Sequence, residues 1–233
     1  MIYCIIPARQ NSKAVSHKNI RMLAGKPVLQ HSIISAKQLL PNENIYLSTD
    51  SENYAQIGKE EGINIRMRSD IACSDTADGS DILLDLIYAE NFKPDDIIVV
   101  FLPSCPYRPK DLLLSVWDKL PEFIDSYYNS MRTGHEMSET VYKKYFYDQC
   151  GGWESIYPEL SVEDCDIPRQ SFRKSYSAQG FLDCTKVSAV IGKKKYMPSP
   201  IMAVKIPFIP EIDTEEDFNY LKYIMEVKNA KTN

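Results

Sequence analysis

Short apolar runs alternate with stretches of helical periodicity over the first half of this 233-residue chain. Because each run is short and bounded by turn residues, strands are expected at residues 2–6, 45–47, 63–67 and 97–102. Helices are expected between and after them, at residues 27–40, 52–61, 81–90 and 109–120. This alternation predicts an α/β fold with parallel pairing and right-handed crossovers. The run at 97–102 is the most apolar and is expected at the centre of the sheet.

The pattern breaks over residues 125–173, which are rich in tyrosine and polar residues and have weak helical periodicity. We interpret this segment as an insertion of irregular strands and loops. Amphipathic aromatic residues are favoured at protein interfaces, so a partner surface is expected here, and a mobile lid is the alternative. The strand pattern resumes at residues 177–185 and 203–206. A final helix over 215–227 is expected to begin with a capping box of Thr214 and Asp217.

Composition excludes several classes of protein. A formal net charge of −5 disfavours a nucleic-acid-binding protein. The longest purely apolar run, 97–102, is far too short to span a membrane, and the N-terminus does not have the layout of a signal peptide. The six cysteines are scattered and form no CxxC pair, which argues against a disulfide framework or a zinc cluster. A single domain in a reduced, cytoplasmic protein is expected.

The loop at residues 8–19 is the first candidate site. Pro7 is expected to end the first strand, because proline cannot continue a ladder. The loop then carries the cations Arg9, Lys13 and Lys18, with Ser12 between them. Ligands of open α/β sheets bind outside the carboxyl ends of the strands, so we hypothesise that this loop holds nucleotide phosphates. A solvated basic loop is the alternative.

The acidic run at 211–217 is the second candidate site. Glu211 and Asp213 are expected at a strand end, where alternate residues share a face. Paired carboxylates beside a nucleotide usually hold Mg²⁺. Negative charge that complements the dipole of the following helix is the alternative reading.

Two further segments lie in positions that suit a site. Arg66 and Arg68 precede a polar loop with Asp75, whose small residues permit a base or ribose to approach. The turn 103–108 follows the most apolar strand. Cys105 within it has no base nearby in the sequence, so a structural thiol is favoured over a nucleophile.

Taken together, these segments resemble the acylneuraminate cytidylyltransferases, which make CMP-sialic acid and related CMP-nonulosonates. The matching motifs follow one another in order over nearly the whole chain, at 8–13 (Ala-Arg-Gln-Asn-Ser-Lys), 18–19, 48–50, 68–77, 103–108, 169–170 and 211–215. The first motif is the most specific to the family.

The resemblance implies a Rossmann-like nucleotidyltransferase fold, with a mostly parallel sheet, helices on both faces and residues 125–173 as an inserted dimerisation segment of a homodimer. It implies that CTP and a nonulosonic acid yield the CMP-sugar and pyrophosphate with Mg²⁺. The implied catalytic residues are Arg9, Lys13, Lys18 and Asp213, with Asp213 and Glu211 as metal ligands. The implied nucleotide contacts are Ala8, Arg9, Ser12, Lys13, Lys18, Asn19, Arg68, Ala77 and Gly79. The implied sugar contacts are Leu102, Ser104, Lys143, Arg169, Gln179, Gly180 and Asp183.

The chain departs from the family mainly on the sugar side. Leu102 replaces a glutamine, Asp183 replaces a tyrosine, and Glu211 replaces the first aspartate of the metal motif. We therefore expect the same reaction on a sugar acid other than ordinary N-acetylneuraminate. A non-catalytic nucleotide-binding or scaffold protein is the alternative. A nicotinamide oxidoreductase is disfavoured because the chain has no GxGxxG fingerprint.

Overall fold

The computed structural model describes residues 1–10, 15, 17–74 and 76–228. The chain divides into two compact units. The core unit comprises residues 1–133, 179–204 and 209–233, and the inserted unit comprises residues 134–178 and 205–208. None of the helices within the described residues has the length and apolar character needed to cross a membrane.

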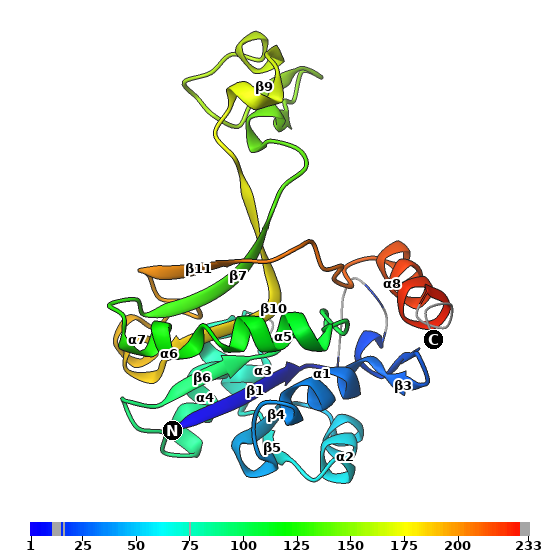
Figure 1. Ribbon diagram of the computed structural model, residues 1–233, viewed down its shortest axis with the longest axis vertical. Helices are drawn as coiled ribbons and strands as arrows, with labels where there is room; N and C mark the ends of the chain where they lie inside the picture. Colours follow the sequence, from blue (N-terminus) through cyan, green and yellow to red (C-terminus); the bar gives the residue numbers. More distant parts are fainter. Residues whose placement is uncertain (11–14, 16, 75, 229–233) are drawn as a thin grey trace. The chain divides into compact units, whose positions relative to one another are not determined.

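A seven-stranded sheet carries the strands in the order β11-β7-β10-β6-β1-β4-β5 (Figure 1). Their bounds in that order are Ile201–Lys205, Ser130–Glu136, Tyr176–Lys186, Ile97–Val100, Ile2–Ala8, Ile45–Thr49 and Asn64–Met67. The strands β6, β1, β4 and β5 pair in parallel, as predicted, whereas β10 runs antiparallel to β6. The expectation that the most apolar strand lies at the centre is confirmed, since β6 is the middle strand of the seven.

The first strand runs through Pro7, so the expectation that this proline ends it was wrong. Pro7 pairs with Ser48 in the parallel register of β1 and β4. Alternate residues of a parallel strand direct their backbone groups to the same neighbour, and the carbonyl of Ile5 accepts a bond from Phe101 N–H on the β6 side. Pro7 faces that same side beyond the end of β6 at Val100, so its missing N–H leaves no ladder bond unmade.

Five predicted helices of the core unit begin close to the expected positions, whereas the helices at Asp70–Cys73, Leu120–Asp125 and Val187–Lys193 were not predicted. The helix bounds are α1 Val28–Lys37, α2 Glu52–Glu60, α3 Asp70–Cys73, α4 Gly79–Ala89, α5 Lys110–Trp117, α6 Leu120–Asp125, α7 Val187–Lys193 and α8 Glu215–Lys222. Short elements complete the unit: η1 Lys18–Ile20, β2 Met22–Leu23, β3 Lys26–Pro27, η2 Asn42–Asn44 and the π-helical turn η6 Tyr223–Lys228. Pro27 and Pro109 stand at the N-caps of α1 and α5, and Thr214 and Asp217 form the predicted capping box of α8.

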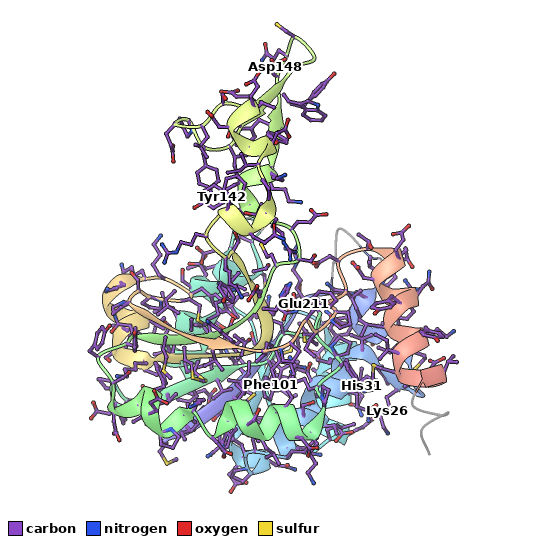
Figure 2. All side chains as sticks on the ribbon, turned by 45° about the horizontal axis from the view of Figure 1, so that its top comes forward. Lys26, His31, Phe101, Tyr142, Asp148 and Glu211 are labelled. Atoms are coloured by element: carbon purple, nitrogen blue, oxygen red, sulfur yellow. The ribbon has the colours of Figure 1, made fainter. Side chains whose placement is uncertain are left out.

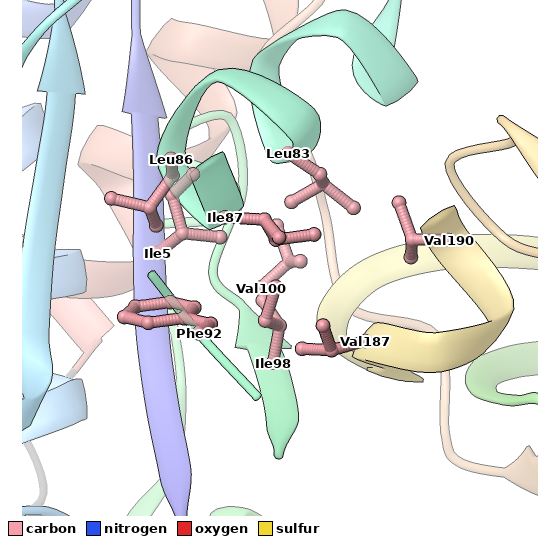
Figure 3. Packing of buried hydrophobic residues seen from close by; sticks show 9 residues of the cluster. All are labelled: Ile5, Leu83, Leu86, Ile87, Phe92, Ile98, Val100, Val187 and Val190. Carbon is pink, nitrogen blue, oxygen red and sulfur yellow. The ribbon is translucent and has the colours of Figure 1, made fainter. Parts of the chain in front are cut away.

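Apolar side chains fill the space between the sheet and its helices. One buried cluster joins β1 and β6 to α4 and α7 (Figure 3) and consists of Ile5, Leu83, Leu86, Ile87, Phe92, Ile98, Val100, Val187 and Val190. Cys4 and Ile6 flank Ile5 and point to the opposite face of β1, where they are also buried. A second cluster joins α8 to the segment around β2 through Val15, Leu23, Val28, Ile212, Phe218 and Leu221. This second cluster brings residue 212 beside the loop that follows β1.

The inserted unit has a small aromatic core of its own. Its elements are η3 Val141–Lys143, β8 Tyr145–Tyr147, β9 Trp153–Ser155, η4 Glu163–Asp166 and η5 Arg169–Ser171. Tyr142 stacks on Tyr157 and Phe172, with ring centroids 4.7 and 4.9 Å apart. Asp148, labelled with Tyr142 in Figure 2, accepts the N–H groups of Cys150 and Gly152 and closes the turn between β8 and β9. The unit overlaps the predicted insertion, and residues 125–133 of that prediction belong to the core unit.

Candidate active site

A pocket of 310 Å³ opens where β1, β4 and β5 end. Arg9 follows β1, Asp50 follows β4 and Arg68 follows β5, and all three side chains line it. The other lining residues are Ala72, Cys73, Ser74, Ala77, Asp78, Gly79 and Ile82. The carboxyl ends of neighbouring parallel strands meet at one edge of a sheet, which is the usual place for a ligand. The structure thus brings together Arg9, Arg68, Ala77 and Gly79, which the sequence assigned to a nucleotide.

The two arginines of β5 have different roles. Arg66 forms a bidentate pair with Asp85, with both N···O distances at 2.8 Å, and so is part of the scaffold. Arg68 donates from Nε to Ser48 Oγ at 3.0 Å and from Nη2 to Ser48 O at 3.1 Å. Burial lowers the pKa of Arg68, and the charge of Asp50 opposes that shift. Arg68 is therefore held in one orientation at the wall of the pocket.

The N-terminus of α4 forms another wall of the pocket. Asp78 caps this helix by accepting the N–H of Ser80 at 2.6 Å, and the Asp81 carboxylate accepts the N–H of Asp78 at 3.0 Å. A Cβ at Gly79 would come within 2.7 Å of the Tyr196 ring. Only glycine permits this close packing, and Gly79 itself lines the pocket.

The loop after β1 is fixed at its far end. Asn19 is buried and donates from Nδ2 to the backbone oxygen of Arg9 at 3.1 Å. This bond connects Asn19 to Arg9, which are both predicted nucleotide contacts. It holds the end of the loop beside its beginning. Ala8 is the last, buried residue of β1. Ser12, Lys13 and Asp75 lie outside the described residues.

Lys18 meets the acidic segment, as the sequence implied. Its Nζ donates to the backbone oxygen of Ile212 at 2.8 Å. Burial lowers the pKa of Lys18, while the neighbouring charges of Asp213 and Glu211 oppose that shift. The N–H of Ile212 donates to Ser104 O at 2.7 Å, so the segment is also tied to the turn after β6.

The expected strand at Glu211 and Asp213 is absent from the structure, and that prediction was wrong. Residues 206–212 have no regular structure, and the burial of the Ile212 side chain, not a ladder, positions its neighbours. Glu211 accepts the N–H of Gly180, and burial, together with the charge of Asp213, raises the pKa of Glu211. Glu211, at the centre of Figure 2, therefore lies close to Asp213 without sharing a strand face with it.

The donor set at this point suits a shared magnesium ion. Within the described part of the chain, no three Asp, Glu, His or Cys residues converge on one point. Mg²⁺ commonly takes one or two carboxylates from the protein and completes its shell with substrate phosphates and water. Glu211 and Asp213 fit that arrangement.

Arg108 is buried in the turn after β6 and holds that turn together. It donates to the backbone oxygens of Phe181 at 2.7 Å, Leu102 at 3.0 Å, Gly180 at 3.2 Å and Cys105. Burial raises the pKa of the Cys105 thiol to about 12, which supports its interpretation as a structural thiol.

The predicted sugar contacts of the core unit gather near this turn. Leu102 packs so closely on Gly180 that a Cβ there would lie 2.5 Å from Leu102 Cδ1. The side-chain amide of Gln179 is buried and donates to Ile209 O, while its oxygen accepts the N–H of Ile209 at 3.4 Å. Both polar atoms of the Gln179 side chain therefore form hydrogen bonds with the backbone of Ile209.

Asp183 lies on β10 with a partner that sequence reasoning missed. Its side chain is 1% exposed, and Oδ2 lies 3.4 Å from Arg132 Nε and 3.5 Å from the Tyr196 hydroxyl. Burial raises the pKa of Asp183 to about 7 in spite of the charge of Arg132. A signal was present in the sequence: an aspartate inside the apolar run of β10 requires a buried partner, and Arg132 is the cation on the strand next to it.

The raised pKa of Asp183 makes the stability of the protein depend on pH. Between the unfolded pKa near 3.8 and the folded pKa of about 7, the folded state holds a proton that the unfolded state has lost. This group's contribution to the free energy of unfolding should fall by about 1.4 kcal/mol per pH unit across that window. Asp183→Asn should remove this slope, so its stability relative to wild type should rise from pH 4 to pH 7 in urea denaturation.

Asp85→Asn is the control of opposite sign. Burial raises the pKa of Asp85, but hydrogen bonds from Arg66 and Ser69 outweigh burial and leave it below the usual value. The stabilisation from Asp85 should therefore be lost on acidification below about pH 4. A parallel pH dependence for Asp183→Asn and wild type would contradict the role given to Asp183.

Two predicted sugar contacts belong to the inserted unit. Arg169 donates to Ser138 O and lines a pocket of 190 Å³. Its other lining residues are Glu136, Met137, Thr140, Gln170, Phe172, Arg173, Lys174 and Ser175. Lys143 lies in η3 and does not line this pocket. The inserted unit thus has a basic hollow around Arg169.

Comparisons with known proteins agree with these features. A family model described as cytidylyltransferase matches residues 3–122. The chain is 27% identical over 228 residues to the N-acylneuraminate cytidylyltransferase of Streptococcus agalactiae serotype V, which covers 92% of this chain and 51% of that protein. It is 33% identical over 117 residues to the CMP-N,N'-diacetyllegionaminic acid synthase of Legionella pneumophila, covering 48% of this chain and 50% of that protein. The chain spans about half the length of the curated relatives it matches.

The fold is shared with solved structures. CMP:2-keto-3-deoxy-manno-octonic acid synthetase, solved in complex with CTP, superposes with a TM-score of 0.68 at 17% identity, covering 97% of this chain and 99% of that one. This likeness confirms the predicted nucleotidyltransferase fold. The family match covers the strands and helices that build the pocket around Arg9, Asp50 and Arg68. This chain belongs to the cytidylyltransferase family.

Proposed function

We propose that this protein transfers CMP from CTP to a sugar acid of the nonulosonic type and releases pyrophosphate. The observation that carries the proposal is the pocket where three strand ends place Arg9 and Arg68 beside Gly79 at the start of α4. The relatives named N-acylneuraminate cytidylyltransferase and CMP-N,N'-diacetyllegionaminic acid synthase support the choice of acceptor class. The departures at Leu102 and Asp183 favour an acceptor other than ordinary N-acetylneuraminate.

The chemistry is an in-line displacement at phosphorus. A hydroxyl of the acceptor attacks the α-phosphorus of CTP and gives up its proton to solvent. A new P–O bond forms, and the bond from the α-phosphorus to the bridging oxygen of pyrophosphate breaks. Arg9 and Lys18 offset charge on the triphosphate, and Ala77 and Gly79 give the cytidine a close-fitting surface. The protein's contribution is positioning and fixed positive charge, not a covalent intermediate.

Glu211 and Asp213 would hold Mg²⁺ together with phosphate oxygens. The ion would supply additional positive charge at the transferring group. Lys18 Nζ donates to Ile212 O, and the positive charge of Lys18 acts on both carboxylates and offsets their mutual repulsion. The burial of Glu211 gives Asp213, which is exposed, the greater access to a hydrated ion.

Asp213→Asn should raise the Mg²⁺ concentration needed for half-maximal pyrophosphate release by about tenfold or more, because an amide oxygen is a weaker ligand than a carboxylate. A magnesium titration of the initial rate measures the shift. Glu216→Gln is the matched control, since Glu216 is exposed in the first turn of α8. Equal magnesium dependence in wild type and Asp213→Asn would contradict the ligand assignment.

The inserted unit is proposed to form the contact of a homodimer. Phe146, Tyr147 and Trp153 on β8 and β9 are 59%, 71% and 64% exposed, an unusual amount of free aromatic surface. Large exposed apolar patches mark interaction surfaces. Light scattering on the wild type and on Trp153→Ser measures the proposed dimer and its loss.

The function is tested by incubating the protein with CTP, Mg²⁺ and a panel of acids: N-acetylneuraminate, N,N'-diacetyllegionaminate and 2-keto-3-deoxy-manno-octonate. Pyrophosphate release and a CMP-sugar product are expected with at least one acid, with CTP preferred over UTP and ATP. CTP binding by calorimetry without turnover on any acid would favour the second candidate, a non-catalytic nucleotide-binding protein. The departures from the family at Leu102, Asp183 and Glu211 are the observations that favour this second candidate.

A further inference from the structure

An ion pair of Arg132 and Asp183 lies at the same sheet edge as the proposed site. Asp183 pairs with Val100, the last residue of β6, and Leu102 follows two residues later. Arg132 comes from β7, the neighbour of β10 on the side away from β6. The pair therefore stands on the acceptor half of the sheet, while Arg68 and its pocket lie beyond β1 on the other half.

The geometry of this pair is poor for a purely structural ion pair. Asp183 Oδ1 and Arg132 Nε are both buried and without a hydrogen-bond partner, and the two side chains approach only to 3.4 Å. The scaffold pair of Arg66 and Asp85 makes two bonds of 2.8 Å. A buried charge with incomplete partners is costly, so stability alone does not account for this arrangement.

The terminal nitrogens of Arg132 are available to a ligand. The side chain is 35% exposed although Nε is covered, and no hydrogen bond joins either terminal nitrogen to another described residue.

Tyr196 connects this pair to the nucleotide pocket. Its hydroxyl faces Asp183 at 3.5 Å, and its ring packs on the backbone of Gly79. One aromatic side chain thus separates the cation of Arg132 from the proposed cytidine position. An acceptor bound next to CTP would lie within reach of Arg132.

We propose that Arg132 binds the carboxylate of the acceptor acid and that Asp183 is a positioning residue that holds Arg132. This inference rests on the proposed function. A guanidinium matches a carboxylate with two parallel N–H···O bonds, which lysine does not do. The expectation that Asp183 touches the sugar changes accordingly: its carboxylate is covered and acts through Arg132. An acidic acceptor group, not a hydroxyl, is what this site selects.

The test compares the acid that gives turnover with its methyl ester, used as a competitive inhibitor. Arg132→Met should raise the KM for the acid by about ten- to a hundredfold, the loss of a charged hydrogen bond. The KM for CTP and the inhibition constant of the ester should change little, because neither includes the lost contact. Arg132→Lys should recover part of the preference for the acid, since it restores the positive charge but not the two parallel N–H donors of a guanidinium.

The controls separate binding from folding. Arg132→Met/Asp183→Leu removes both charges, so it should fold even if Arg132→Met does not, and it should show the same loss of preference for the acid. Lys37→Met breaks an ion pair with Glu61 between α1 and α2 and should leave the preference unchanged. An unchanged preference in a folded Arg132 variant would overturn the inference and leave a structural ion pair. No turnover by wild type with any acid would instead overturn the proposed function, and this inference with it.

Discussion

Lys18→Met is expected to lower CTP-dependent pyrophosphate release by about a hundredfold or more. The variant loses a cation at the triphosphate and also the bond from Nζ to Ile212 O that holds the acidic segment. A charged hydrogen bond contributes about 1.5–3 kcal/mol, or one to two decades in rate, and here Glu211 and Asp213 also lose a neighbouring positive charge. Initial rates at saturating CTP and Mg²⁺ measure the loss.

Lys26→Met is the matched control, because Lys26 is an exposed lysine on the neighbouring β3. Its rate should equal that of wild type. Thermal unfolding of Lys18→Met should show a small shift only, so the rate loss is not explained by unfolding. A rate within about threefold of wild type would mean that Lys18 serves the fold and not the reaction.

Arg108→Met is expected to lower the free energy of unfolding by about 3–5 kcal/mol. The guanidinium is buried and supplies donors to four backbone oxygens in the turn after β6 and at the start of the β10 core. Methionine fills much of the volume but donates nothing, so the four carbonyls lose their bonds from Arg108. The oxygen of Leu102 keeps the N–H of Cys105 at 3.1 Å and the hydroxyl of Ser32 at 3.4 Å. Urea denaturation at neutral pH measures the change.

Lys110→Met tests whether the effect belongs to Arg108. Lys110 is exposed at the start of α5, two residues further on, and its replacement should change stability by no more than about 0.5 kcal/mol. If Arg108→Met unfolded at the same urea concentration as wild type, the hydrogen bonds to the turn would contribute nothing net. The turn would then be held by its prolines and by the burial of Phe101.

The local pattern of apolar and polar residues was sufficient to predict the parallel part of the sheet. The strands β1, β4 and β6 are mainly apolar and largely buried, whereas the edge strand β5 is only partly buried. Pro27, Gly62 and Thr214 mark helix ends through their own backbone chemistry. The positions of Arg9 and Arg68 at the pocket followed from the same logic, since each comes directly after a strand, whereas Asp50 in the pocket wall was not predicted as a site residue.

The features of the fold and the site that the sequence did not predict depend on long-range contacts. The antiparallel direction of β10 relative to β6 depends on the path of the chain through residues 137–175, between β7 and β10. No local pattern in β10 itself distinguishes antiparallel from parallel pairing. The acidic segment is positioned by the burial of Ile212, not by a strand. The pairing of Arg132 with Asp183 joins two residues of the core unit that are separated in the sequence by the inserted segment 134–178. The pairing of buried polar side chains depends on how the strands pack in the sheet, and it cannot be predicted from either strand alone.

The contact between Leu102 and Gly180 restricts the order in which the acceptor side of this protein can change. A side chain at position 180 is blocked while Leu102 stays, because its Cβ would meet three Leu102 carbons within 3.1 Å. Leu102 can shrink first, and only then can position 180 grow, so the two substitutions are not independent. A search for variants with a new acceptor should therefore open position 102 before it varies position 180.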